Sequence, residues 1–244
     1  MNNSLVVITG HSKGLGKALM HHYLNKGKFD VIGISRSKLD FDSPRLQQIS
    51  LDLADLDVLK NELEDVFPRG DYKEIILINN AGWIGEIKPI GSMHPKEMRV
   101  QVNVNLLAPM YLTNAFIRAY KGYPAKKLVC NISSGAATRP VAGWGGYCST
   151  KAALAMFTQV ANKESGTSEF RFFSLAPGIV DTDMQNEIRQ AAEQDFPELK
   201  KFLEFKEQDE LANPEEVAKK IEFLLSNPER FPEVTQDVRQ YEVS

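Results

Sequence analysis

The sequence has few of the features that mark membrane, secreted or nucleic-acid-binding proteins. No apolar stretch approaches the ~18 residues needed to span a bilayer. The start, MNNSLVVITG, lacks the basic and long apolar regions of a signal peptide, so we expect a strand there. No long basic run occurs and the formal net charge is −3, which favours neither nucleic acid nor an anionic membrane as a partner. The two cysteines, Cys130 and Cys148, form neither a disulfide framework nor a metal-ligand pattern. We therefore predict reduced cysteines, no metal site and a cytoplasmic protein.

Strand and helix patterns alternate along the 244 residues, without a linker, repeat or low-complexity segment. A short apolar strand ends near Asp52, and QDVRQYEV near the C-terminus is a candidate for the last strand. Runs typical of buried parallel strands lie at 5–10, 29–36, 74–82, 126–134 and 170–178. This order predicts one α/β domain over residues 1–244.

The first forty residues predict a strand, a glycine-rich turn, a helix and a second strand. Gly10, Gly14 and Gly16 form a T-G-x-x-x-G-x-G pattern, which brings backbone N–H groups at a helix N-terminus against a pyrophosphate. The G-x-G-x-x-G spacing does not fit, and G-x-x-x-x-G-K-[ST] fails at Ala18, which disfavours nucleoside triphosphate hydrolysis. The alternative is a merely flexible turn.

Where the second strand ends, dinucleotide sites select between cofactors. The chain has Ser35-Arg36-Ser37 there and no carboxylate until Asp40. Arg36, together with Lys13 in the glycine turn, favours NADP(H), although a solvated arginine is the alternative. Asp52 could hold the adenine amino group, or either Asp52 or Asp55 could cap the next helix.

Tyr147 and Lys151 form a Y-x-x-x-K pattern on a predicted helix, where residues i and i+4 share one face. Free tyrosine titrates near ~10, and a nearby cation can lower such a pKa by roughly 1–3. A tyrosine of this kind could exchange a proton with an alcohol or carbonyl oxygen. Ser134, at the end of a strand, could hydrogen-bond the same oxygen. The alternative is a surface tyrosine with a helical lysine neighbour.

Two further stretches and three separate apolar residues complete the predicted site. Residues 95–120 predict one long helix or two, in which Asn103, Asn105 and Pro109 interrupt the apolar spacing. Residues from about 182 to 212 are amphipathic and could form a substrate lid. Trp83, Trp144 and Met184 could line an apolar pocket, or could be ordinary core.

Together these motifs resemble the short-chain dehydrogenase/reductases over nearly the whole chain. The T-G-x-x-x-G-x-G turn at 9–16, Asp52-Leu53, N-N-A-G at 79–82, Ser134, Y-x-x-x-K at 147–151 and Pro177-Gly178 occur in the family's order. The resemblance implies a single-domain Rossmann fold, a doubly wound, mostly parallel sheet of about seven strands flanked by helices.

The resemblance also implies roles for individual residues. Tyr147 would be the general acid/base, and Lys151 would lower its pKa and hold the nicotinamide ribose. Ser134 would orient the carbonyl, and Asn105 would hold a water in the proton relay. The implied cofactor-binding residues are Gly10, Ser12, Lys13, Gly14, Leu15, Gly16, Arg36, Asp52, Leu53, Asn80, Ala81, Gly82, Tyr147, Lys151, Pro177, Gly178, Val180 and Thr182. The implied substrate residues are Ser134, Tyr147, Trp144 and Met184.

Within the family, GWGGYCSTKAALAMF and APGIVDTDMQ look like the sepiapterin reductase and benzil reductase group. This likeness implies NADPH-dependent reduction of a ketone, one carbonyl of a vicinal diketone such as benzil or a sepiapterin-like side chain. The tail departs from the family's G-x-x-[VI]-x-V-D pattern, and Asp237 and Glu242 are only candidates for the carboxylate that sepiapterin reductases offer a pterin. A homodimer or homotetramer could form through the helix at 151–161. A non-catalytic NADP(H)-binding sensor with the same fold is the alternative function.

Overall fold

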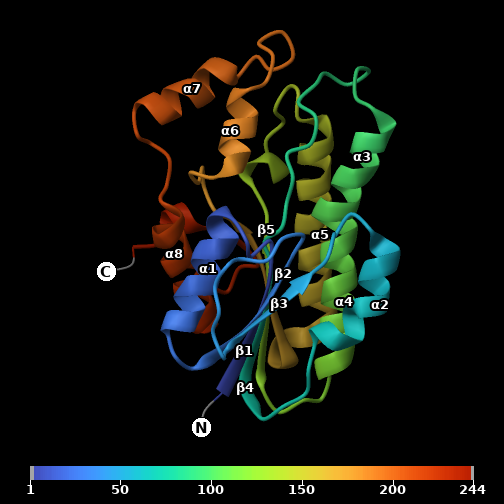
Figure 1. Cartoon of the computed structure of the whole chain (residues 1–244), viewed down its shortest axis with the longest axis vertical. Helices are drawn as coiled ribbons and strands as arrows, with labels where there is room; N and C mark the ends of the chain where they lie inside the picture. The colour runs from blue at the N-terminus through green and yellow to red at the C-terminus, as the bar shows by residue number, and fades with distance from the viewer. Residues whose placement is uncertain (1–2, 243–244) are drawn as a thin grey trace.

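Seven parallel strands form one sheet in the order β3-β2-β1-β4-β5-β6-β7 (Figure 1). The computed structural model describes residues 3–242, except the side chains of residues 166–168. The strands are β1 (Asn3–Thr9), β2 (Phe29–Ser35), β3 (Leu46–Ser50), β4 (Tyr72–Asn79), β5 (Lys126–Ile132), β6 (Phe170–Ala176) and β7 (Thr235–Asp237). The predicted Rossmann-type sheet is confirmed, and every strand pair in it is parallel.

Helices cover both faces of the sheet. α1 and α8 lie on one side, and α2, α4 and α5 lie on the other (Figure 1). The helices are α1 (Gly14–Asn25), α2 (Leu56–Val66), α3 (Pro95–Val102), α4 (Ala108–Tyr120), α5 (Gly145–Glu169), α6 (Asp183–Arg189), α7 (Leu199–Glu207) and α8 (Pro214–Ser226). α6 and α7 stand beyond one edge of the layered body, above the carboxyl ends of the strands.

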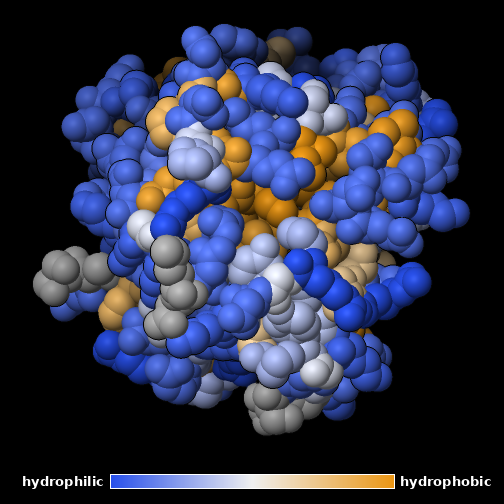
Figure 2. Space-filling view, turned by 60° about the horizontal axis from the view of Figure 1, so that its bottom comes forward, coloured by the Kyte–Doolittle hydropathy of each residue, from blue (hydrophilic) through white to orange (hydrophobic). Residues whose placement is uncertain are grey.

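Alternation along the strands divides the core into two layers. Val6 and Ile8 of β1 pack with α1 and α8, whereas Leu5 and Val7 pack with α2 and α4. Strands buried on both faces are apolar almost throughout, which explains the continuous runs in the sequence. The face drawn in Figure 2 is mostly hydrophilic, with hydrophobic residues showing mainly in one patch of its upper half.

The predicted helix over 95–120 is neither one regular helix nor two separate ones. α3 and α4 are joined by a π-helical segment, η1 (Asn103–Leu107), in which the Ala108 N–H donates to the carbonyl of Asn103. Pro109 explains this segment, because proline has no N–H to donate to the carbonyl of Asn105 four residues earlier. One helical turn therefore contains an extra residue, and the helix continues through Pro109 without a break.

The ends of the other elements follow local rules. Asn213 caps α8 by accepting from the N–H groups of Glu215 and Glu216, as the N-P-E-E sequence predicts. Asp55 caps α2 through the Val58 N–H, at 3.1 Å. Near the C-terminus the predicted strand is shorter than expected, because β7 ends at Asp237 and a 3-10 turn, η4 (Val238–Gln240), follows. Within residues 3–242, no helix has the length and apolar character to cross a bilayer.

Candidate active site

One cleft of about 1110 Å³ opens at the carboxyl ends of the strands and collects most of the predicted site residues. It is lined by all but two of them: Gly10, Ser12, Lys13, Gly14, Leu15, Arg36, Asp52, Leu53, Asn80, Ala81, Gly82, Ser134, Trp144, Tyr147, Lys151, Pro177, Gly178, Val180, Thr182 and Met184. The exceptions are Gly16 and Asn105. In open parallel sheets, ligands bind at this edge.

Gly16 packs against the backbone of the glycine turn and does not face the cleft. A Cβ on Gly16 would lie 2.0 Å from the carbonyl oxygen of Gly10, so only glycine lets α1 start directly against the end of β1. The first turn of α1 has no acidic residue, and its N-cap, Lys13, makes no side-chain cap hydrogen bond. The N-terminus of α1 therefore presents uncapped N–H groups and a positive dipole end to the cleft, which suits a pyrophosphate.

Exposed polar side chains form the end of the cleft beside β2 and β3. Arg36 follows β2, is exposed and makes no ion pair among residues 3–242. Lys13 is also exposed, but its Nζ lies 3.3 Å from Asp183 Oδ2 at the start of α6. Asp52 accepts only from the Ala54 N–H among the described protein groups, at 3.0 Å, whereas Asp55 is the helix cap. Among residues 3–242, the Arg36 and Asp52 side chains at this end of the cleft therefore have no ion-pair partner.

The opposite end of the cleft holds Tyr147 and Lys151, both on α5 and both buried, at 7% and 3% exposed. Lys151 Nζ lies 5.7 Å from the centre of the Tyr147 ring and donates to the carbonyl of Ile132 at 2.8 Å. The two side chains lie on one helical face, as predicted, and the surface-pair alternative does not hold.

Burial dominates the proton affinities at this end. It raises the pKa of Tyr147 to about 12, which a hydrogen bond with Ser134 partly offsets, and it lowers the pKa of Lys151 to about 8. The expected lowering of the Tyr147 pKa by the neighbouring cation is not found: the pKa of Tyr147 stands above its ordinary value, and the largest cause is desolvation of the phenol. Ser134 itself is held by the Ala136 N–H, which donates to its Oγ at 3.1 Å.

Asn105 lies behind the cleft wall instead of in it. Its Oδ1 accepts from the Trp83 N–H and its Nδ2 donates to the Trp83 carbonyl, both at 2.8 Å, and Nδ2 also reaches Thr150 Oγ1 at 3.3 Å. A Cβ on Gly82 would lie 3.4 Å from Lys151 Nζ and 3.6 Å from Asn105 Oδ1. The Asn105 amide therefore joins the loop after β4 to η1 and α5, and Asn105 does not line the cleft.

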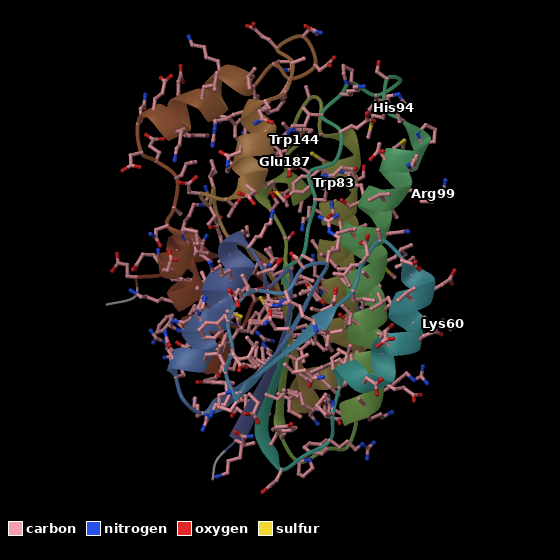
Figure 3. All side chains as sticks on the ribbon, in the orientation of Figure 1. Lys60, Trp83, His94, Arg99, Trp144 and Glu187 are labelled. Carbon is pink, nitrogen blue, oxygen red and sulfur yellow. The ribbon has the colours of Figure 1, made fainter. Side chains whose placement is uncertain are left out.

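Aromatic side chains wall the cleft beside Tyr147. The Trp144 ring stacks on Phe196 with centroids 5.4 Å apart and lies 5.4 Å from Phe202 and 5.6 Å from Tyr147. Figure 3 places Trp83, Trp144 and Glu187 in one region between α6 and α5, and all three line the cleft. The predicted lid over 182–212 forms α6 and α7, which contribute Met184, Ile188, Phe202 and Phe205 to the lining.

The comparisons agree with this geometry. The family model of the short chain dehydrogenases matches residues 4–193. The chain belongs to the short-chain dehydrogenase family. It is 40% identical over 240 residues to a benzil reductase ((S)-benzoin forming) of Bacillus cereus, which covers 93% of this chain and 96% of the relative. It is 30% identical to the sepiapterin reductase of Bos taurus, over 93% of this chain and 91% of the relative.

Solved structures of the family superpose closely. The KRED1-Pglu enzyme matches with a TM-score of 0.80 and 29% identity, over 91% of this chain and 94% of that one. 4-Hydroxyisoleucine dehydrogenase complexed with NADH matches with a TM-score of 0.78 and 25% identity, over 96% of both chains. The protein is therefore an oxidoreductase of a family that uses a nicotinamide cofactor.

The cleft also contains three cations that the sequence reasoning missed, Arg139, Lys201 and Arg239. No motif of the family marks these positions. Arg239 comes from the unusual tail and binds both carboxylate oxygens of Asp237. Of the two carboxylates predicted for a pterin, Asp237 is therefore paired, and Glu242 is exposed and outside the cleft lining.

Proposed function

We propose that this protein is an NADPH-dependent carbonyl reductase that reduces one carbonyl of a vicinal diketone such as benzil to an α-hydroxy ketone. The observation that carries the proposal is the buried pair Tyr147 and Lys151, with the half-buried Ser134, beside an aromatic wall at one end of the cleft. The identity of 40% to a benzil reductase supports the same substrate class.

The described residues suit NADP(H). The uncapped N-terminus of α1 and the turn from Gly10 to Leu15 would hold the pyrophosphate, and Arg36 would pair with the 2′-phosphate. Asp52 and Leu53 would contact the adenine, and the residues after β4 and β6 would contact the nicotinamide end. When bound, the cofactor supplies the hydride.

In this proposal the protein supplies hydrogen bonds and the proton. Ser134 and Tyr147 donate to the carbonyl oxygen as negative charge develops on it, and Tyr147 gives up its proton to form the alcohol. Lys151, held by the Ile132 carbonyl, stabilises the phenolate and passes on a replacement proton. A water on the main-chain carbonyl of Asn105, which Pro109 leaves without an α-helical donor, would complete the relay.

The tail gives less support to a pterin substrate. A pterin would need a free carboxylate near the cleft, and Asp237 is neutralised by Arg239, which also lowers the pKa of Asp237. The aromatic wall of Trp144 and Phe202 instead suits an aryl group.

We also propose a homo-oligomer built on α4 and α5. These helices lie on the same side of the sheet and leave Tyr111, Met156 and Val160 between 37% and 59% exposed. Met156→Glu should shift the protein to a smaller species in size-exclusion chromatography with light scattering, since it places a charge on this apolar face. An unchanged mass would exclude this face as the subunit interface.

The free cysteines, Cys130 and Cys148, also fit the reducing environment of a cytoplasmic protein.

The activity test follows NADPH consumption with benzil, an aliphatic diketone, sepiapterin and an aryl monoketone, with NADH in parallel. We expect benzil to be reduced fastest and NADPH to be preferred. Turnover of sepiapterin but not of benzil would overturn the diketone assignment. Tight NADPH binding without turnover of any compound would favour the non-catalytic sensor.

A further inference from the structure

His11 is a fully buried histidine inside the glycine turn, at 0% exposed. Its ring lies flat against Gly33 of β2, where a Cβ would come within 2.4 Å of the imidazole Cγ. Gly33 is therefore the residue that makes room for the ring. A buried imidazole needs a hydrogen-bond partner for each nitrogen.

Both nitrogens of His11 have such partners, and these lie on two other segments. Nε2 lies 2.9 Å from Gln48 Oε1 on β3, and this oxygen also accepts from the Leu39 N–H at 2.8 Å, so Nε2 is the donor. Nδ1 lies 3.1 Å from the hydroxyl of Ser35, the last residue of β2. The ring thus joins the glycine turn, the end of β2 and β3.

The Ser35 hydroxyl extends these contacts to the loop that carries Arg36. The single Ser35 hydroxyl proton goes either to the carbonyl oxygen of Ser37, at 2.7 Å, or to His11 Nδ1. Ser37 Oγ donates to Ser12 Oγ in the glycine turn at 3.3 Å. The Arg36 carbonyl accepts from Ser50 Oγ at 2.9 Å. The backbone on both sides of Arg36 is therefore held, although its side chain is exposed.

We propose that His11 is a positioning residue for the adenosine 2′-phosphate of the cofactor. It fixes the Ser35–Ser37 loop relative to the glycine turn, so that Arg36 and the turn meet the phosphate at a set distance. Groups held by packing and by surrounding hydrogen bonds bind more selectively than mobile ones. The inference rests on the proposed preference for NADP(H), and it adds a buried determinant of that preference.

The test measures dissociation constants for NADPH and NADH by the fluorescence of the reduced nicotinamide, which needs no substrate. The variants are His11→Asn, Ser35→Ala and Gly33→Ala, which removes the space under the ring. The matched control is Ser174→Ala, a buried serine of β6 whose hydroxyl has no hydrogen-bond partner among residues 3–242. Arg36→Gln tests the direct phosphate contact.

We expect the ratio of NADH to NADPH dissociation constants to fall about tenfold in His11→Asn and about threefold in Ser35→Ala, the effect of losing one or two hydrogen bonds. Affinity for NADH should stay within about twofold, and Ser174→Ala should leave the ratio unchanged. Equal weakening of both cofactors would show a merely structural role and overturn the proposal. Ser35→Ala removes a single hydroxyl, so it keeps the test decisive if His11→Asn does not fold.

Arg36→Gln distinguishes the positioning role of His11 from the selection of NADPH by Arg36. If Arg36→Gln lowers the ratio and the His11 and Ser35 variants do not, the positioning role fails while NADPH selection by Arg36 stands. If Arg36→Gln leaves the ratio unchanged, the proposed cofactor selection itself fails.

Discussion

The two ends of the cleft are built in opposite ways. At one end, where we propose that the adenosine binds and which is called the adenosine end below, the charged side chains of Lys13, Arg36 and Asp52 are exposed. Beneath them lie the buried hydrogen bonds of His11. At the reaction end, Tyr147 and Lys151 are themselves buried. Burial raises the pKa of Tyr147 and lowers the pKa of Lys151, and both shifts favour the neutral form of the side chain.

The residues proposed to select the cofactor are therefore distinct from the residues proposed to carry out the reaction. Exposed charges interact through water, so they change the relative affinity for NADPH and NADH by modest factors. Buried groups cost stability, but their protonation states respond strongly to a ligand that brings charge or excludes water. Substitutions at the reaction end should therefore change turnover and stability, whereas those at the adenosine end should change only cofactor affinity.

The largest effect is expected from Tyr147→Phe. Losing the phenolic proton should lower kcat with benzil by about 10²-fold to 10⁴-fold, which is the usual contribution of general acid catalysis. NADPH affinity, measured by fluorescence, should stay within about threefold, since the ring and its packing on Trp144 remain. Retained turnover would refute the role of Tyr147.

Lys151→Met should separate activity from stability. Turnover should be lost, because the variant has no cation beside Tyr147. Below pH 8, Lys151 is charged both folded and unfolded, and its burial destabilises the fold. Between the folded pKa of about 8 and the ordinary value of 10.5, the unfolded chain binds more protons, so the stability of the native protein rises with pH.

The variant lacks this burial cost, so at pH 7 it should be more stable by about 1–3 kcal/mol, reduced by loss of the hydrogen bond to Ile132. Urea unfolding from pH 7 to 10.5 measures the difference, which should shrink as pH rises. A difference independent of pH would mean that Lys151 is not buried in its charged form.

The smallest effect in this series is expected from Phe202→Ala in the aromatic wall. Removing a ring that packs on Trp144 should raise KM for benzil about tenfold, with little change for an aliphatic diketone. Leu203→Ala, the exposed neighbour on α7, is the matched control. Equal losses for both substrates would show that Phe202 serves only the packing of α7.

The sequence predicted the parts of the site that depend on local spacing. The i, i+4 relation of Tyr147 and Lys151, the glycine turn and the positions of the strands along the chain are set by residues close together in the sequence, and the structure has them as expected. The sign of the Tyr147 pKa change was not predictable, because burial depends on elements as distant as α7. Likewise, the contact of Asn105 with Trp83 joins residues 22 positions apart, and its pairing depends on how the loop after β4 packs against η1.

The strand order has a consequence for how the chain assembles during synthesis. β2 and β3 join β1 on one side, and β4, β5, β6 and β7 then join on the other side, each in the order in which it leaves the ribosome. No strand has to enter between two that are already paired. The sheet can therefore grow outward from β1: after β4, the newest strand is the edge that the next one joins, and β3 remains the other edge.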